Sequence, residues 1–181
     1  MILRTTKYNP EFRNDQGHYL KEEWTAVSDI GKVFDGKVLT ETDYIEDEKR
    51  YARTAKLLLE NFEIESFYII YLKKYRHKLE VLSIDEADDT ARRKRLFKSV
   101  KDGSLLPVDN IEDVVILCLR NDIYCDIICG NPRLRLSFEY DYYMELDINF
   151  YDKKLINDLR QIGLFVEMFS SGIPDDAWDD A

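Results

Sequence analysis

Apolar and polar residues alternate along the stretch from Leu134 to Phe150. Every even-numbered residue in this stretch is apolar, and the odd-numbered residues are polar or charged, with Tyr143 as the exception. A period of two is typical of β-structure that buries one face and leaves the other to solvent. A single strand of this length would extend about 55 Å, which is too long for a chain of this size.

The stretch must therefore contain a turn or a bend. A two-residue hairpin loop would move the apolar residues from even to odd positions, and no such switch occurs. We predict a three-residue loop at Tyr140, Asp141 and Tyr142, which pairs Phe138 with Met144. A sharply bent strand is the alternative, because the segment lacks the glycine that tight turns favour.

A strand is predicted at residues 123–129, before the alternating stretch. The turn residues 130–132 separate the two. A four-residue loop places Ile127 opposite Leu136, so that apolar residues face one another. A three-residue loop would instead bring Asp126 to the buried face, where an unpaired carboxylate is costly. We therefore predict the four-residue loop.

The clearest helix is predicted over residues 41–61. From Tyr44 onward, apolar residues recur at the 3.6-residue spacing of one helix face. Thr40 and Asp43 fit a capping pattern with acids in the first turn. Within residues 83–106 acids precede bases, which suits a helix because carboxylates favour its positive N-terminal end.

The remaining segments predict shorter elements. Strands are expected at 1–6, 67–72 and 164–169. Helices are expected from Asn110 to about Asn121 and from Asp152 to Gly163. Residues 7–21 are expected to form a loop, and residues 170–181 a mobile acidic tail. Residues 67–72 also fit helical spacing, and the helical spacing of Trp24–Phe34 is limited by glycines to a short piece. We predict one α+β domain, with a mixed, largely antiparallel sheet packed against several helices.

Composition narrows the possible partners. The chain of 181 residues carries a net charge of -10, which opposes direct binding to nucleic acid or to an anionic membrane and favours a cationic protein partner. No secretory signal and no apolar run of about 20 residues is visible. With three cysteines and no export signal, a reduced, cytoplasmic protein is expected.

No recognisable set of catalytic residues stands out in the sequence. His18 and His77 lie in no metal-binding spacing and are expected at the surface, and no phosphate-binding glycine loop is present. Cys125 and Cys129 are expected in the core, where free cysteine is common. The basic run 92–95 is expected on a solvated helix face. We expect no enzymatic activity, no cofactor and no metal.

Two groups of residues are candidates for contact with a basic partner, on grounds of charge and expected exposure. They are Asp85, Glu86, Asp88 and Asp89 in the acidic segment, and Glu139, Asp141, Tyr143, Glu145 and Asp147 on the odd-numbered face.

Three stretches resemble one protein family. Glu22–Gly31 (EEWTAVSDIG), Leu119–Cys125 (LRNDIYC) and Tyr140–Met144 (YDYYM) are similar, in the same order, to motifs of bacterial immunity proteins from contact-dependent growth inhibition and related polymorphic toxin systems. Ala26, Tyr124 and Glu139 stand where that family has serine, tryptophan and glycine. The resemblance covers about half of the chain and does not extend to residues 63–110.

The resemblance implies an inhibitor that binds the C-terminal domain of a cognate toxin in the cytoplasm. Many such toxins are nucleases with basic clefts, which an acidic protein can occupy. The alternative from the residues alone is a generic acidic interaction or regulatory module without a toxin partner. An enzyme is the third reading, and it requires a deep pocket with convergent polar groups.

Overall fold

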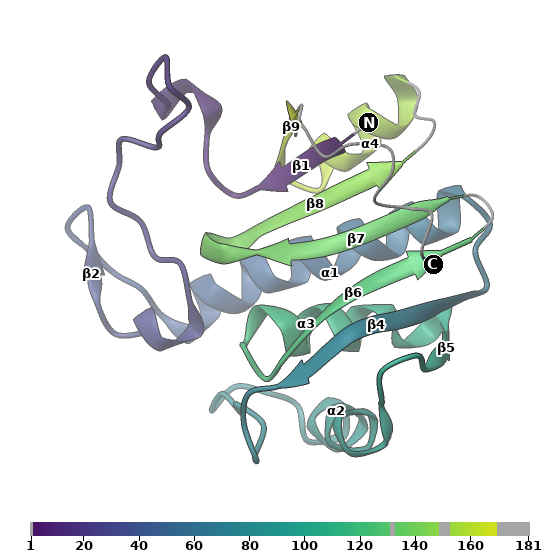
Figure 1. Cartoon of the computed structure of the whole chain (residues 1–181). Coiled ribbons are helices and arrows are strands. Elements are labelled where there is room, and N and C mark those ends of the chain that lie inside the picture. The colour runs from purple at the N-terminus through teal and green to yellow at the C-terminus, as the bar shows by residue number, and fades with distance from the viewer. Residues whose placement is uncertain (1, 131–132, 149–152, 170–181) are drawn as a thin grey trace.

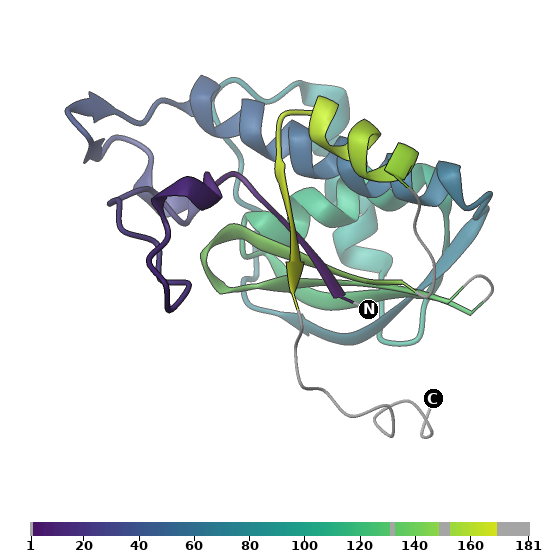
Figure 2. The same cartoon turned by 90° about the horizontal axis from the view of Figure 1, so that it is seen from above.

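The protein is described by a computed structural model over residues 2–130, 133–148 and 153–169. Seven strands form one antiparallel sheet in the order β5–β4–β6–β7–β8–β1–β9, and α1, α3 and α4 lie against one of its faces (Figures 1 and 2). The described helices are α1 Glu41–Asn61, α2 Ala87–Ser99, α3 Ile111–Leu119 and α4 Lys153–Gln161. The described strands are β1 Ile2–Thr6, β2 Val33–Phe34, β3 Lys37–Val38, β4 Ser66–Lys74, β5 Leu105–Pro107, β6 Ile123–Cys129, β7 Leu134–Glu139, β8 Tyr143–Ile148 and β9 Phe165–Phe169. The predicted α+β class is confirmed.

Both predicted hairpin registers are confirmed. Ile127 pairs with Leu136 between β6 and β7, as the four-residue loop requires. Phe138 pairs with Met144 between β7 and β8, around a short 3₁₀ turn at Tyr140–Tyr142. The stretch is therefore a hairpin and not a bent strand.

The turn between β7 and β8 is made without glycine. Asp141 and Tyr142 both adopt the left-handed region, with φ of 62° and 65°. Aspartate tolerates this conformation, whereas a bulky residue such as tyrosine is a marked outlier there. The surrounding packing must therefore hold Tyr142 in place.

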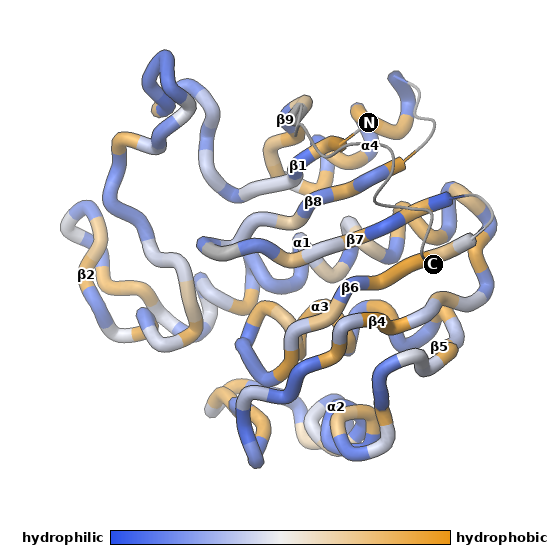
Figure 3. Tube along the Cα trace, viewed as in Figure 1, coloured by the Kyte–Doolittle hydropathy of each residue, from blue (hydrophilic) through white to orange (hydrophobic). Residues whose placement is uncertain are grey.

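Helix α1 has the bounds predicted from the sequence. The Thr40 side chain accepts a hydrogen bond from the amide of Asp43, and the Asp43 carboxylate accepts one from the amide of Thr40. Its apolar stripe, including Tyr44 and Tyr51, is buried against the sheet and α3. The strand β6 lies inside the sheet, between β4 and β7, and is coloured hydrophobic over much of its length (Figure 3).

Several other predictions need correction. Trp24–Phe34 contains a 3₁₀ turn at Val27–Asp29 and the strand β2, because the turn residues Asp35 and Gly36 fold β2 back onto β3. Asn110 does not cap α3 through its side chain, since it lies in a 3₁₀ turn that runs directly into the helix. The helix predicted within 83–106 spans only Ala87–Ser99.

The strand predicted at 67–72 is present but longer, and it is only half-buried. Tyr68 and Tyr71 are exposed, and the pairing with β6 is irregular between Ile70 and Lys73. The predicted cap at Asp152 and the predicted tail at 170–181 lie outside the described residues. None of the described helices is long and apolar enough to cross a membrane.

Candidate partner-binding surface

A pocket of about 670 Å³ opens at the end of the sheet where the β7–β8 turn lies. It is called the turn-end pocket below. Its lining comes from four parts of the chain that are far apart in sequence: Thr25 and Ala26; Lys73 and Tyr75; Cys118, Leu119, Asn121, Ile123 and Tyr124; and Phe138, Glu139, Asp141 and Tyr142. Each of the three stretches that carry the family resemblance contributes lining residues.

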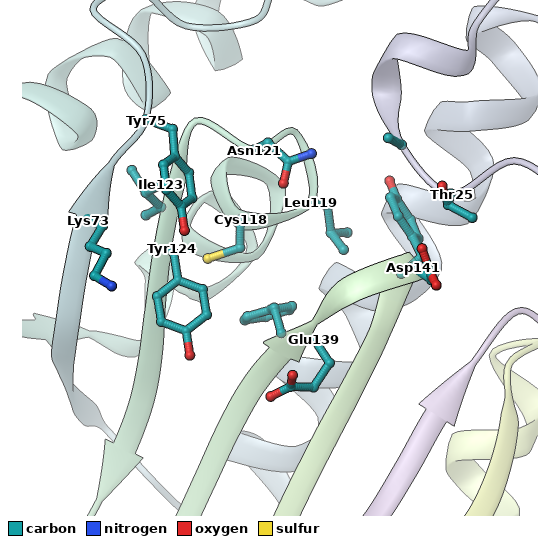
Figure 4. Close-up of a pocket in the computed structure, with 13 residues that line it drawn as sticks. Thr25, Lys73, Tyr75, Cys118, Leu119, Asn121, Ile123, Tyr124, Glu139 and Asp141 are labelled. Atoms are coloured by element: carbon teal, nitrogen blue, oxygen red, sulfur yellow. The ribbon is translucent and has the colours of Figure 1, made fainter.

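The side chains of this pocket form distinct walls (Figure 4). Tyr75 and Tyr124 lie together on one side, and Asp141 lies beside Thr25 on the opposite side. The carboxylate of Glu139 lies between these two sides. The pocket thus combines aromatic surface with two carboxylates.

An aromatic cluster holds the Asp141 side of the pocket. The ring of Tyr142 packs against Trp24, Tyr44 and Tyr51, with centroid separations of 4.9, 5.8 and 5.3 Å. The Tyr51 hydroxyl donates a hydrogen bond of 2.5 Å to the backbone carbonyl of Tyr142. These contacts account for the left-handed turn, because they fix both the ring and the backbone of the strained residue.

The segment that supplies Thr25 and Ala26 is fixed by its own turn. The Asp29 carboxylate accepts hydrogen bonds from both backbone amides, at 2.9 and 3.1 Å. The Tyr8 hydroxyl donates to the carbonyl of Trp24, next to this pair. The segment therefore has a defined place at the rim of the pocket.

The α3 end of the pocket is held by the residues that follow the helix. Asn121 is left-handed, with φ of 56°, and it is exposed at the rim. The next residue, Asp122, is buried and accepts a hydrogen bond from the backbone amide of Glu80. Burial raises the pKa of Asp122 to about 6, because removal from water disfavours the charged carboxylate.

One predicted contact residue, Asp85, is not at the surface. Its carboxylate accepts hydrogen bonds of 2.6 and 2.9 Å from the Arg120 guanidinium and lies 3.1 Å from the guanidinium of Arg93. Arg120 also donates two hydrogen bonds to Glu48, at 2.6 and 2.8 Å. Asp85 is therefore a structural residue, and the predicted exposure of Asp85 and Arg93 is wrong.

The rest of the acidic segment divides by its contacts. Glu86 and Asp88 are exposed at the start of α2. Asp89 is half-buried and forms an ion pair of 2.8 Å with Arg92, which also binds Asp113. Glu86 and Asp88 are therefore the members of this group that remain accessible to a partner.

The odd-numbered face of β7 and β8 is more covered than expected. The Tyr143 hydroxyl accepts a hydrogen bond of 3.0 Å from Arg13, and Tyr143, Glu145 and Asp147 are all half-buried. Burial and the neighbouring Glu139 raise the pKa of Glu145. Only Glu139 and Asp141 of this group are exposed.

Asp126 illustrates why this face is covered. It points to the predicted outer side of β6, yet it is fully buried, and Arg135 binds it at 2.6 Å. The sequence correctly predicted the register, but a polar side of a central strand is not necessarily exposed, because long side chains from the neighbouring strands cover it.

The structure does not bring the two predicted acidic groups together. The odd-numbered face includes β8, which lies three strands away from β4 in the sheet order. The acidic segment lies at the start of α2, which follows β4 in the chain and packs against α3. Glu139 and Asp141, in contrast, both line the turn-end pocket. This pocket is the best-defined candidate site.

The chemical groups in the pocket lining are aromatic rings, carboxylates, a thiol and a lysine. Neither histidine lines the pocket, and burial raises the pKa of the Cys118 thiol, which disfavours the nucleophilic thiolate. Among the described residues, no cluster of three or more histidines, cysteines or acids is placed to hold a metal. The lining can supply aromatic contact, carboxylate acceptors and one lysine.

The sequence-based selection missed part of this site. Tyr75, Tyr124, Asn121 and Thr25 were not candidates, because no pattern in the sequence shows that they meet. Thr25, Asn121 and Tyr124 lie within the stretches that resemble the immunity-protein motifs. That resemblance was the one feature of the sequence that could have pointed to them. No protein-family model, curated protein or solved structure matches the chain.

Proposed function

We propose that this protein is an immunity protein that binds a cognate toxin domain and blocks its activity. The observation that carries the proposal is the convergence of the three family-like stretches on the turn-end pocket. A specific binding site requires rigidly held residues, and here they come from segments that are distant in sequence.

The charge of the protein supports a basic partner. The net charge is -10, and the exposed acids Glu139 and Asp141 lie at the pocket while Glu86 and Asp88 lie at the start of α2. Such acids accelerate the encounter with a cationic surface, and a few buried anchors then supply most of the affinity. A nuclease is the proposed toxin class, because its nucleic-acid cleft is basic.

The proposal places the protein in the cytoplasm, with no direct binding to nucleic acid or membrane. It acts by occupying the toxin and carries out no reaction itself.

The test is binding to the toxin domain encoded immediately upstream. We expect a complex of nanomolar or tighter affinity by isothermal titration calorimetry, and loss of toxin activity at a one-to-one ratio. A non-cognate toxin domain of similar charge serves as the control. Absence of binding, or equal binding to both domains, would contradict the proposal and favour a generic acidic interaction module.

A further inference from the structure

We propose that the turn-end pocket receives one arginine side chain of the toxin domain as an anchor. This inference rests on the proposed function and identifies the group that the pocket binds. The cavity of about 670 Å³ lies within the range of pockets that hold small ligands. It is therefore large enough for a long side chain.

Charge is the first argument for a cationic occupant. Glu139 and Asp141 are exposed, and no described residue forms a hydrogen bond or ion pair with either carboxylate. Lys73, a cation in the lining, lies on the side of Tyr124 and away from Asp141 (Figure 4). The Asp141 side of the pocket therefore presents negative charge without a counter-charge.

Aromatic surface is the second argument, and it favours arginine over lysine. Tyr75 and Tyr124 lie on the same side of the pocket, across from Asp141 (Figure 4). A planar guanidinium stacks on aromatic rings and presents five donors in a fixed fork, whereas an ammonium is a compact, strongly hydrated charge. Because Glu139 lies between the tyrosines and Asp141, an arginine can contact a ring with its face while its edge donates to Glu139.

The pocket is already formed, which also favours binding of an anchor side chain. The turn carrying Asp141 is fixed through Tyr142 by the aromatic cluster and by the Tyr51 hydrogen bond. A preformed pocket loses little conformational freedom on binding, so more of the contact energy appears as affinity. Arginine is also among the residues that most often act as anchors in protein interfaces.

The test uses a probe that does not require the toxin. A tripeptide, acetyl-Ala-Arg-Ala-amide, is titrated into the ¹⁵N-labelled full-length protein and followed by NMR, with the citrulline analogue as the uncharged, nearly isosteric control. We expect the arginine peptide to shift the backbone amides of Asn121, Glu139 and Asp141, and the citrulline peptide to leave them in place.

Variants assign the effect to the two carboxylates. E139Q and D141N should each weaken the affinity for the arginine peptide about threefold, as expected for one solvent-accessible charge pair. Asparagine tolerates the left-handed conformation of residue 141, so the turn is retained. The control D88N removes an exposed acid outside the pocket and should not change the affinity.

The outcomes separate this inference from the proposed function. Equal shifts with the citrulline peptide, no shift at the pocket amides, or unchanged affinity in both E139Q and D141N would overturn the arginine site. If the toxin binds and the peptide does not, the arginine pocket is wrong and the immunity function stands. If the peptide binds and no toxin does, the pocket stands and the immunity function is wrong.

Discussion

Tyr51 and Tyr142 join the longest helix to the turn that forms the candidate site. The Tyr51 hydroxyl donates to the Tyr142 carbonyl at 2.5 Å and accepts a hydrogen bond of 2.9 Å from the backbone amide of Lys7. One buried hydroxyl therefore satisfies backbone groups from two other parts of the chain.

Replacing Tyr51 by phenylalanine should destabilise the protein by about 1–3 kcal/mol. The substitution retains the ring but leaves the buried carbonyl of Tyr142 and the part-buried amide of Lys7 without their partner. The free energy of unfolding is measured by urea denaturation. Y68F is the matched control, since Tyr68 is exposed, and its effect should stay within about 0.5 kcal/mol. Equal stability of Y51F and Y68F would show that the hydrogen bonds of Tyr51 contribute nothing.

Replacing Arg120 by methionine should cost about 3–5 kcal/mol. Glu48 and Asp85 would lose the guanidinium that binds both, and a buried carboxylate without its counter-charge is strongly unfavourable. Urea denaturation again gives the change. R53M, at an exposed position on α1, is the control and should behave like the wild type. A loss below about 1 kcal/mol in R120M would indicate that the cluster is solvated in solution.

The pH dependence of stability should carry a contribution from Asp122. Because the pKa of Asp122 is raised to about 6 in the folded protein, the folded state binds the proton more tightly than the unfolded chain. Protonation of Asp122 therefore stabilises the folded state. This stabilisation is complete below the pKa that Asp122 has in the unfolded chain, and it is lost as the pH rises through about 6.

The D122N variant has no such group, so it isolates this contribution. Between pH 7.5 and pH 5.5, the wild type should gain about 1 kcal/mol relative to D122N. Urea denaturation at several pH values in this range measures the difference. A difference that stays constant with pH would mean that Asp122 titrates normally.

The three cysteines should be unreactive in the folded protein. Cys118, Cys125 and Cys129 are buried, and burial raises the pKa of Cys118 and raises that of Cys129 to about 11. With Ellman's reagent at pH 8, we expect no rapid reaction in buffer and the reaction of three thiols in guanidinium chloride. Rapid reaction of one thiol in buffer would identify an opening motion at that cysteine.

Charge reversal at the pocket should slow the encounter with the proposed toxin domain. We expect E139K to reduce the association rate about three- to tenfold at low salt, and the effect to shrink as salt screens the charges. E60K, an exposed reversal on α1, is the control. Stopped-flow fluorescence at several salt concentrations measures both rates. Equal rates for E139K and E60K would place the contact surface elsewhere.

Half-buried acids of the odd-numbered face should matter less for association than Glu139. Glu145 lies beside Arg4 in the β1–β8 pairing, so its charge is partly balanced within the protein. E145Q should therefore alter the association rate less than E139Q does. The reverse order would indicate that the outer face of β8 is the main contact surface.

Features that depend on neighbours in sequence were predictable. The Thr40 cap and the apolar stripe of α1 are local, because each depends on residues three or four positions apart. The two hairpins were predictable for a related reason. The parity of the apolar residues allows only certain loop lengths, and this constraint held even though Asp141 and Tyr142 replace the expected glycine.

Features that depend on distant partners were not predictable in the same way. Trp24–Phe34 carries a helical pattern, but Trp24 instead packs against the rings of Tyr44 and Tyr142. Asp85 was predicted at the surface from its place in an acidic run, and its burial follows from Arg120, which lies 35 residues later in the chain. No local pattern records such a pairing.

Residue patterns alone predict the α+β class, the bounds of α1 and the registers of the two hairpins, and composition gives the negative charge. Packing between distant segments sets which acids remain accessible and which four segments line one pocket. Periodicity reports only the face on which a residue lies. Exposure and convergence depend instead on what the rest of the chain packs against that face.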